Sequence, residues 1–414
     1  MGKIRVLQIN KMYYPVIGGV ETVVRQIAEG LNDKTDMKAL VCQPKGKGAV
    51  EIINGVEVHK AASLGIAFSM PVSLDFFFKF QKMKKKADII HIHMPFPLAD
   101  IAVRVLGFKG KIILWWHSDI VRQRLFLVPY KPFLEYLLRR ADRIIVATEG
   151  HIEHSEHLRE YRDKCVVIPF GVDQKIFERS ERSERSEKSK TSERSKISKT
   201  SKTSAVSETS KTSEISAVSE ICERNVVSAI SDRLVSFLFV GRLIYYKGCD
   251  ILVKAFSRVR GATLTIVGGG PLEDAIKEDA RKLGIAGSIC FKQKMEAREL
   301  SEEYANCDVL VLPSVAKSEA FGIVQIEAMS FGKPVINTNL PSGVPQVSLD
   351  GVTGLTVEPG NVDALANAMQ RLVDDRDLKE TLGKNAYTRV RAEFTMGKMI
   401  DSIYREYEDL ALNG

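Results

Sequence analysis

The sequence predicts an α/β protein made of two doubly wound domains, each built around a mostly parallel sheet. In both halves, short runs of Val, Ile and Leu alternate with segments of helical periodicity. Runs that are apolar throughout are typical of strands covered on both faces by helices. A polar repeat separates the two halves, and its composition fits an insertion between domains.

Length and composition are those of a globular protein of two or three domains. The chain has 414 residues, of which 44% are hydrophobic and 27% charged. No apolar run reaches the roughly 18 residues of a membrane-spanning helix, and the N-terminus lacks the apolar core of a signal peptide. The six cysteines include no Cys-x-x-Cys pair, which favours reduced thiols. We therefore expect a cytoplasmic protein.

The net positive charge of the chain indicates which classes of partner to expect. The net charge is +8 and the pI is about 9.0, which favours anionic ligands or surfaces. No zinc finger, RNA-binding aromatic signature or basic heptad region is visible, so nucleic acid is not an expected partner. Phosphorylated ligands and anionic lipid remain as expected classes of partner.

The first domain is expected over residues 1–177. A helix with apolar positions at helical spacing is predicted at Glu21–Leu31. The expected strands are Ile4–Asn10, Lys38–Cys42, Asp88–His93, Lys111–Trp116, Arg143–Thr148 and Cys165–Pro169.

Residues 178–221 form a low-complexity segment of Glu-Arg-Ser and Lys-Thr-Ser repeats with almost no large apolar side chains. Such a segment cannot bury enough surface to offset its ordering entropy, so we expect it to be disordered. A tolerated insertion in an interdomain linker and a partner-binding or phosphorylated segment both fit its composition.

The second domain is expected over residues 222–396, followed by a final helix over about residues 397–414. Helices are predicted at Cys249–Arg258, Leu272–Leu283, Ala297–Ala305, Asp363–Phe394 (with a break) and Met399–Leu410. The expected strands are Leu234–Val240, Ala262–Val267, Ser288–Lys292, Asp308–Leu312, Pro334–Thr338 and Gly354–Val357.

Glu319 and Glu327 bracket the most informative run of the chain. An apolar strand precedes them, and Gly332 and Pro334 end the helix after them. Eight helical residues rise roughly 12 Å, whereas paired glycosidase carboxylates lie roughly 5–9.5 Å apart. The spacing therefore suggests an extended ligand, such as a nucleotide sugar, held at two places.

Three glycine-containing loops follow predicted strands, at the edge where parallel sheets bind ligands. Gly18 and Gly19 open the first helix, where backbone can approach a phosphate. Arg242 and Lys247 lie in a glycine-flanked loop and could clamp two phosphates. Gly268 begins a triple-glycine turn. Each loop alone also fits a plain strand–helix turn, and none has the dinucleotide-binding Gly-x-Gly-x-x-Gly pattern.

Histidines follow two strands of the first domain. His117 comes directly after a strand, where it could bind a sugar hydroxyl or assist proton transfer. His91 and His93 share one face of their strand, and we expect His93 to line the cleft. No further ligands can be named for a metal at this pair, so no metal is expected.

Residues Asp75–Lys86 mix four phenylalanines with lysines. A basic amphipathic helix of this kind is typical of contact with anionic membrane. A crossover helix with a solvated lysine end fits the same pattern.

Taken in order, these motifs resemble a retaining glycosyltransferase of family 4, with the two-domain fold called GT-B. The resemblance rests on Gly18-Gly19, on Gly241-Arg242-Leu243 with Lys247-Gly248, on Gly268, and on Glu319-x7-Glu327 before Gly332-Lys333-Pro334. It spans both domains and leaves out only the repeat insertion, which departs from the family pattern.

The resemblance implies a role for each matching residue. Arg242 and Lys247 would hold the donor diphosphate, and Glu327 would bind the ribose hydroxyls. Glu319 would contact the donor sugar. His117, with His93, would face the sugar and acceptor. The remaining donor-binding positions would be Gly18, Gly19, Gly268, Phe321, Gly322 and Ile323.

The resemblance also implies a reaction without a cofactor or metal, because cationic side chains and helix ends take over the metal's charge role. The final helix would cross back to the first domain. The donor would be a GDP- or UDP-linked hexose, with mannose favoured, and the acceptor a glycan or lipid-linked glycan at the inner face of the membrane. A sugar-nucleotide epimerase or hydrolase of the same fold is the alternative.

Overall fold

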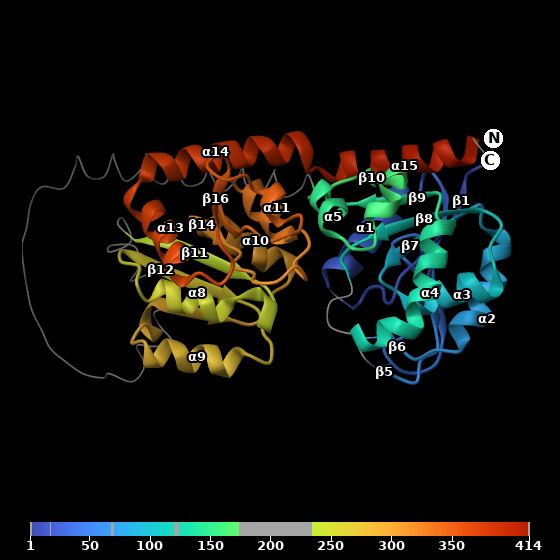
Figure 1. Cartoon of the computed structure of the whole chain (residues 1–414), viewed down its shortest axis with the longest axis horizontal. Coiled ribbons are helices and arrows are strands. Elements are labelled where there is room, and N and C mark those ends of the chain that lie inside the picture. Colours follow the sequence, from blue (N-terminus) through green and yellow to red (C-terminus); the bar gives the residue numbers. More distant parts are fainter. Residues whose placement is uncertain (1, 17, 68–69, 120–123, 174–233, 413–414) are drawn as a thin grey trace, which may run out of the picture.

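The computed structural model describes residues 2–16, 18–67, 70–119, 124–173 and 234–412, except for the side chains of residues 124–129. The repeat segment predicted to be disordered, residues 178–221, lies outside the described residues. The described part forms two α/β domains side by side, joined along one edge by the last helices (Figure 1). The predicted fold class is confirmed.

The first domain is built on a sheet of eight described strands in the order β10-β9-β8-β7-β1-β2-β4-β3. All pairs are parallel except β3–β4. The strands are β1 (Arg5–Ile9), β2 (Asp36–Cys42), β3 (Ala49–Ile53), β4 (Val56–Ala61), β7 (Ile89–Met94), β8 (Lys111–Trp116), β9 (Arg143–Val146) and β10 (Cys165–Val167). A small hairpin, β5 (Ile66–Ala67) with β6 (Met70–Pro71), lies outside this sheet.

Helices cover the first sheet because each carries one apolar face. In α1, for example, Val23, Val24 and Ile27 are buried against the core while the opposite side stays more exposed. The helices of this domain are α1 (Gly19–Leu31), α2 (Asp75–Met83), α3 (Pro97–Leu106), α4 (Arg124–Arg140) and α5 (Glu149–His154).

Helix α2 has the core contacts expected of a crossover helix, one of the two interpretations that its sequence left open. Phe76 and Phe80 are fully buried in the core of the first domain, so only Phe78 of this pair of turns points outward. Lys84, in the following 3-10 turn (Lys84–Lys86), donates hydrogen bonds from its ammonium group to the carbonyl oxygens of Leu106 and Gly107. The aromatic face of α2 is therefore mainly core packing.

The second domain is built on a fully parallel sheet of six described strands in the order β13-β12-β11-β14-β15-β16. The strands are β11 (Val235–Val240), β12 (Ala262–Val267), β13 (Ile289–Lys292), β14 (Val309–Val311), β15 (Val335–Thr338) and β16 (Gly354–Val357). The helices are α8 (Cys249–Phe256), α9 (Glu273–Lys282), α10 (Ala297–Asn306), α11 (Ile323–Ser330), α12 (Val344–Val347), α13 (Val362–Asp374) and α14 (Arg376–Glu393).

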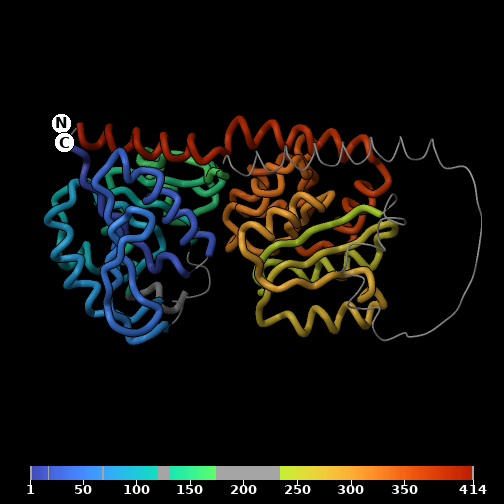
Figure 2. The backbone as a smooth tube through the Cα atoms, turned by 180° about the vertical axis from the view of Figure 1, so that it is seen from behind, coloured from blue at the N-terminus to red at the C-terminus, as the bar shows by residue number. Residues whose placement is uncertain are grey.

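The last helix, α15 (Met396–Leu412), leaves the second domain and runs along the first, as expected (Figure 2). Its apolar face buries Met399, Ile403 and Tyr407 in the core of the first domain. Arg143 anchors the far end through Glu406, at 3.1 Å, and Asp409, at 2.7 Å. The described part of the chain therefore both begins and ends on the first domain (Figure 1).

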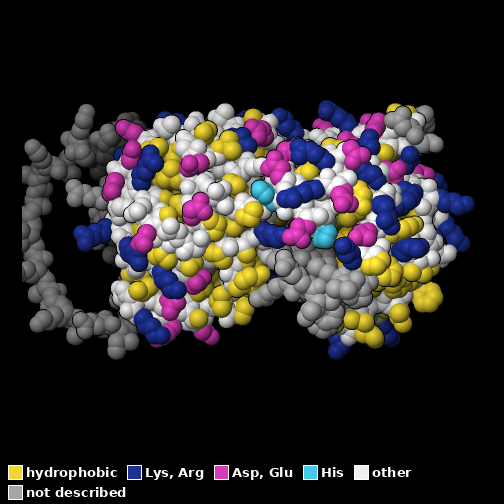
Figure 3. Space-filling model, in the orientation of Figure 1, with side chains coloured by type: hydrophobic (Ala, Val, Ile, Leu, Met, Phe, Trp, Pro, Cys, Tyr) yellow, Lys and Arg dark blue, Asp and Glu magenta, His cyan; other side chains and the backbone are white. Residues whose placement is uncertain are grey.

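On the face of the molecule in Figure 3, basic and acidic side chains are interspersed over both domains. Among the described helices, none is both long and apolar enough to cross a bilayer.

Candidate functional site

Helix α11 begins with its first turn facing the first domain, and a few residues fix the shape of that turn. Gly322 caps the helix with φ of +73°, a left-handed conformation that favours glycine, and a Cβ there would meet Leu312. Gln325 then donates from its amide nitrogen to the carbonyl oxygen of Phe321 at 2.7 Å, and Asn337 donates to Gln325 at 2.9 Å. These buried hydrogen bonds fix the first turn of α11, where the amide of Gln325 also donates to the carbonyl oxygen of Gly322 at 2.9 Å. The amides that precede Gln325 in this turn point out of the helix start, as they do at any helix N-terminus.

Lys247 and Glu319 form a nearly buried ion pair in the second domain. Nζ of Lys247 lies 2.5 Å from Oε2 of Glu319, and their side chains are only 12% and 9% exposed. Ser314 donates to the same carboxylate oxygen at 3.1 Å. Lys247 comes from the loop after β11 and Glu319 from the loop after β14, and these two strands are neighbours in the sheet.

Close packing of two loops requires a glycine at position 268. Gly268 has φ of +133°, and a Cβ there would collide with the carbonyl oxygen of Gly241. The loops after β11 and β12 therefore touch backbone to backbone, which also sets the base of the loop carrying Arg242. Arg242 itself is exposed, and its guanidinium donates to the hydroxyl of Tyr246 at 3.4 Å.

The two domains bring two helix N-termini together. Gly19 is the first residue of α1, and Ile323 is the first residue of α11. A Cβ on Gly19 would lie 3.8 Å from Cδ1 of Ile323, with no closer neighbour than this contact. Because both helices begin here, their positive ends face the same space, which suits an anion such as a diphosphate.

Glu327 lies one turn into α11 and is bound by a residue that the sequence did not single out. The hydroxyl of Tyr304, from α10, donates to Oε2 of Glu327 at 2.6 Å. Burial raises the pKa of the Glu327 carboxyl, and the Tyr304 hydrogen bond partly opposes that rise. One carboxylate oxygen of Glu327 is not used in this bond.

Histidines of the first domain form a buried chain behind the site. Nδ1 of His93 lies 2.8 Å from Nε2 of His117, and Nε2 of His93 lies 2.8 Å from the amide nitrogen of Gln8. His91, two residues before His93, has its Nδ1 2.7 Å from the hydroxyl of Tyr407 in α15. His93 is only 1% exposed, so it lies behind His117 and does not line the cleft as predicted.

Burial keeps these imidazoles neutral. It lowers the pKa of His91 and of His117 to about 3 in each case, and it lowers that of His93 well below its usual range. At neutral pH His117 is therefore a hydrogen-bonding group. The proton transfer considered for His117 from the sequence stays a prediction.

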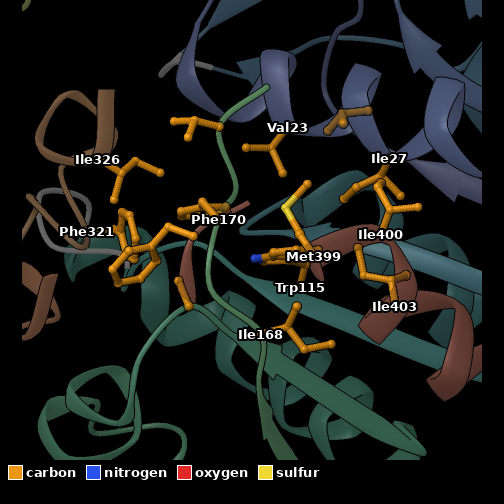
Figure 4. Packing of buried hydrophobic residues seen from close by; sticks show 14 of the residues in the cluster. Val23, Ile27, Trp115, Ile168, Phe170, Phe321, Ile326, Met399, Ile400 and Ile403 are labelled. Atoms are coloured by element: carbon orange, nitrogen blue, oxygen red, sulfur yellow. The ribbon is translucent and has the colours of Figure 1, made fainter. Parts of the chain in front are cut away.

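A stack of aromatic rings connects these histidines to the second domain. The rings of Trp115, His117 and Phe170 are stacked, with Phe170 at 5.6 Å and 5.8 Å from the other two. Phe321, from the loop before α11, meets Phe170 edge to face at 4.9 Å (Figure 4). The segment that carries Phe321, Gly322 and Ile323 is thus packed directly on the first domain.

A narrow crevice continues along the boundary between the domains, beside His117. Asp119 accepts hydrogen bonds from Nε1 of Trp116 at 3.0 Å and from Ser155 at 2.7 Å. Nζ of Lys317, in the second domain, lies 3.8 Å from the other oxygen of Asp119. Polar side chains of both domains therefore meet in this crevice.

The structure brings together most of the predicted site, with one correction to its geometry. Only the residues from Ile323 onward are helical, so the rise of roughly 12 Å for eight helical residues does not apply to Glu319 and Glu327. The two carboxylates instead have separate partners, Lys247 and Tyr304. Gln8, Tyr304 and Phe170 were missed, because nothing near them in the sequence marks a site.

The chain matches two family profiles that follow its division into domains. Residues 17–175 match Glycosyltransferase Family 4, and residues 224–389 match Glycosyl transferases group 1. Among relatives, O-antigen chain mannosyltransferase C of Escherichia coli is 29% identical over 98% of each chain. D-rhamnosyltransferase WbpZ of Pseudomonas aeruginosa is 30% identical over 94% of this chain and 92% of its own.

Solved structures share the fold at low sequence identity. Sucrose-phosphate synthase from Thermosynechococcus elongatus superposes with a TM-score of 0.74 at 20% identity over the whole of both chains. WaaG, a glycosyltransferase involved in lipopolysaccharide biosynthesis, gives 0.65 at 16% identity over 96% of this chain and 98% of its own. With two sheets facing one shared site and family matches along both, this protein belongs to family 4 of the glycosyltransferases and has the GT-B fold.

Proposed function

We propose that this glycosyltransferase moves a hexose, with mannose favoured, from a GDP- or UDP-linked donor to a glycan or lipid-linked acceptor with retention of the anomeric configuration. The observation that carries the proposal is the arrangement around the start of α11. There the Lys247–Glu319 ion pair stands beside a helix N-terminus that contacts Gly19 of the opposite domain.

This arrangement suits a nucleotide diphosphate sugar. The donor diphosphate would lie between the starts of α1 and α11, with Lys247 and the exposed Arg242 supplying positive charge to the leaving group. Glu319 would turn from Lys247 to the sugar hydroxyls. Glu327 would accept hydrogen bonds from the ribose through the oxygen that Tyr304 does not occupy. No metal or other cofactor is part of the proposal.

His117 would hydrogen-bond the transferred sugar from the first domain. The nearby boundary residues Asp119 and Lys317 would meet the acceptor. Neither glutamate needs to form a covalent intermediate, since each already serves a binding role. Mannose is favoured because the full-length Escherichia coli relative is named a mannosyltransferase, and that name with the WbpZ match supports a role in surface polysaccharide biosynthesis.

A donor screen followed by product analysis tests the proposal. GDP, UDP and their hexose conjugates would be compared by thermal shift, since a ligand bound by the folded state raises its stability by mass action. The matching donor should then give a product whose anomeric proton coupling and chemical shift show the donor's configuration. An inverted product would contradict retention.

The alternative, an epimerase or hydrolase of the same fold, makes a different product. It would convert the donor fully in the absence of any acceptor, whereas a transferase should consume donor at the full rate only when acceptor is added. Equal rates with and without acceptor would favour the alternative.

We also propose that the enzyme works at the cytoplasmic face of a membrane and contacts anionic lipid peripherally. The net charge of +8 and the exposed lysines Lys82, Lys85 and Lys86 support this placement. A lipid-linked acceptor would require such contact.

A further inference from the structure

The first domain exposes a continuous apolar surface at the β5–β6 hairpin and the start of α2. Five large side chains of one short segment point into solvent: Leu64, Ile66, Val72, Leu74 and Phe78, which are 81%, 54%, 43%, 76% and 75% exposed. Exposed apolar groups scattered singly are ordinary, but a contiguous patch marks a contact surface. In Figure 3 the apolar side chains gather along the lower edge of this domain.

Backbone pairing holds these residues side by side. The amide of Leu64 donates to the carbonyl of Val72 at 2.9 Å, and Ile66 pairs with Pro71 across the hairpin. Leu74 is the N-cap of α2 and already has helical angles, so Phe78 lies one turn below it on the same face. We name these five residues the hairpin patch.

The hairpin patch stands on a rigid base. Ser73 donates to the carbonyl of Ala62 at 2.6 Å, and Asp75 accepts from the amide of Ala62 at 2.8 Å. On the inner side, Phe76 and Phe80 anchor α2 in the core. The apolar groups are therefore displayed by a fixed scaffold and cannot turn inward to bury themselves.

Exposed lysines flank the hairpin patch on two sides. Gly46 pairs with Ser63, next to Leu64, which places Lys45 and Lys47 beside the hairpin. On α2, Lys82 follows Phe78 by one turn, and Lys85 and Lys86 follow in the 3-10 segment. Within the described residues these five lysines form no ion pair, whereas Lys79 pairs with Asp75 at 3.8 Å.

We propose that the hairpin patch inserts into the interfacial region of an anionic lipid bilayer while Lys45, Lys47, Lys82, Lys85 and Lys86 contact its headgroups. Apolar side chains bordered by lysines match a surface with an apolar interior and a negatively charged boundary. A second copy of the chain would place two sets of lysines against each other, which disfavours self-association through this face. The inference rests on the proposed lipid-linked acceptor and names the element that would hold the enzyme at the membrane.

Vesicle flotation of the full chain tests the hairpin patch without any substrate. Vesicles of phosphatidylcholine with phosphatidylglycerol would be compared with vesicles of phosphatidylcholine alone. The variant Leu74→Ser/Phe78→Ser removes two apolar groups, and serine suits the N-cap position of α2. The matched control, Val50→Ser/Ile52→Ser, removes two apolar groups of β3 that are also exposed, by 55% and 69%.

The wild type should float with anionic vesicles. Leu74→Ser/Phe78→Ser should lower the partition coefficient at least tenfold, and the β3 control should leave it unchanged. The variant Lys82→Gln/Lys85→Gln/Lys86→Gln should lower it roughly a hundredfold on anionic vesicles only. Neutralising three exposed lysines of the second domain, Lys282, Lys294 and Lys384, should have little effect.

Three outcomes would overturn the proposal: a wild type that does not float, a hairpin variant that floats as well as the wild type, or a wild-type dimer that Leu74→Ser/Phe78→Ser converts to monomer. The last would assign the hairpin patch to a second copy of the chain. Because vesicle binding needs no donor, a failure of the proposed sugar transfer would leave this result standing. Transfer to a water-soluble acceptor should be unchanged in all of these variants.

Discussion

Nδ1 of His93 and Nε2 of His117 lie 2.8 Å apart, so one of these two rings donates a proton to the other. The amide nitrogen of Gln8 can only donate to Nε2 of His93, so His93 carries its proton on Nδ1 and donates it to Nε2 of His117. In this orientation Oε1 of Gln8 has no hydrogen-bond partner among the described residues, whereas the reversed amide would leave both N–H donors of the buried NH2 group without an acceptor, which is the costlier arrangement. His117 therefore keeps its own proton on Nδ1.

The first prediction concerns that proton. Long-range ¹⁵N–¹H correlation spectra should show His117 protonated on Nδ1 and unprotonated on Nε2 throughout pH 5 to 8, because its pKa is lowered to about 3. His93→Phe removes the donor and should mix the two tautomers, lowering kcat about tenfold with little change in nucleotide affinity. His91→Phe, in the same stack but hydrogen-bonded to Tyr407, is the control. A wild-type spectrum with the Nε2–H tautomer would refute the assignment.

The second prediction separates stability from activity at the Lys247–Glu319 pair. Lys247→Met or Glu319→Gln alone leaves a nearly buried partner unsatisfied and should lower the free energy of unfolding by about 3–5 kcal/mol. The double variant should recover most of that loss, since no unpaired charge remains. All three should lose transfer activity by about 10²-fold or more, because each lacks a group that would bind the donor. Denaturant unfolding and steady-state kinetics measure the two effects, and a double variant with restored activity would remove both residues from the site.

The third prediction contrasts two glycines. Gly268→Ala forces a Cβ against the carbonyl of Gly241 from a left-handed backbone, so it should destabilise the second domain. In Gly19→Ala the new Cβ would meet only Ile323, at 3.8 Å, so the melting temperature should change little. The donor KM should nevertheless rise several-fold, because the methyl group stands between the two helix starts. Equal melting losses in both variants would contradict this distinction.

The fourth prediction uses Tyr304→Phe to test the role of Glu327. Without the hydroxyl, the pKa of Glu327 should rise further, since burial already raises it and Tyr304 opposes that rise. Loss of this hydrogen bond should weaken nucleoside diphosphate binding by about 1 kcal/mol. Calorimetry with the 2′,3′-dideoxy nucleotide should show no difference between variant and wild type. A difference there would place Glu327 away from the ribose.

The fifth prediction concerns stability in mild acid. His91 and His117 have a folded-state pKa of about 3, below the unfolded value of about 6.5, so the unfolded state binds protons first as the pH falls. Their contribution to stability is complete above pH 6.5 and is lost as the pH falls toward 3. At pH 5 each should cost about 2 kcal/mol relative to pH 7.5. His91→Phe should make the unfolding midpoint less dependent on pH, and an unchanged slope would contradict the buried neutral state.

The sequence was sufficient to predict two doubly wound domains with mostly parallel sheets, because Val- and Ile-rich runs such as Lys111–Trp116 mark buried strands directly. The order of the strands within each sheet was not predicted. The sequence was also sufficient to predict a helix that opens at Gly18-Gly19. The start of α11 at Ile323 was not predicted, because the spacing from Glu319 to Glu327 was counted as helical throughout. The β3–β4 hairpin was missed although its signal was present. Asn54-Gly55 joins two strands there, both with positive φ, as a two-residue hairpin turn requires.

Other features could not be read from local patterns. Tyr304 reaches Glu327 across 23 residues, Gln8 reaches His93 across 85, and His91 reaches Tyr407 across 316. Such contacts depend on how helices pack after the sheet has formed, which periodicity does not encode. The same is true of α2, where composition alone could not tell that Phe76 and Phe80 face the core while Phe78 faces out.

Backbone hydrogen bonds join the segment where the chain leaves the first domain to the segment where it returns. The amide of Val172 donates to the carbonyl of Phe394 at 2.8 Å, and the amide of Met396 donates back to Val172 at 2.9 Å. The two connections between the domains therefore share one pivot. A small rotation about this pivot would move the far ends of the domains further than the near ends. Donor entry and product release would depend on this pivot, because Phe394 meets Phe321 edge to face at 6.1 Å and so links it to the segment before α11. Substitutions at Thr395 should therefore change turnover, although Thr395 is not among the groups proposed to bind the donor.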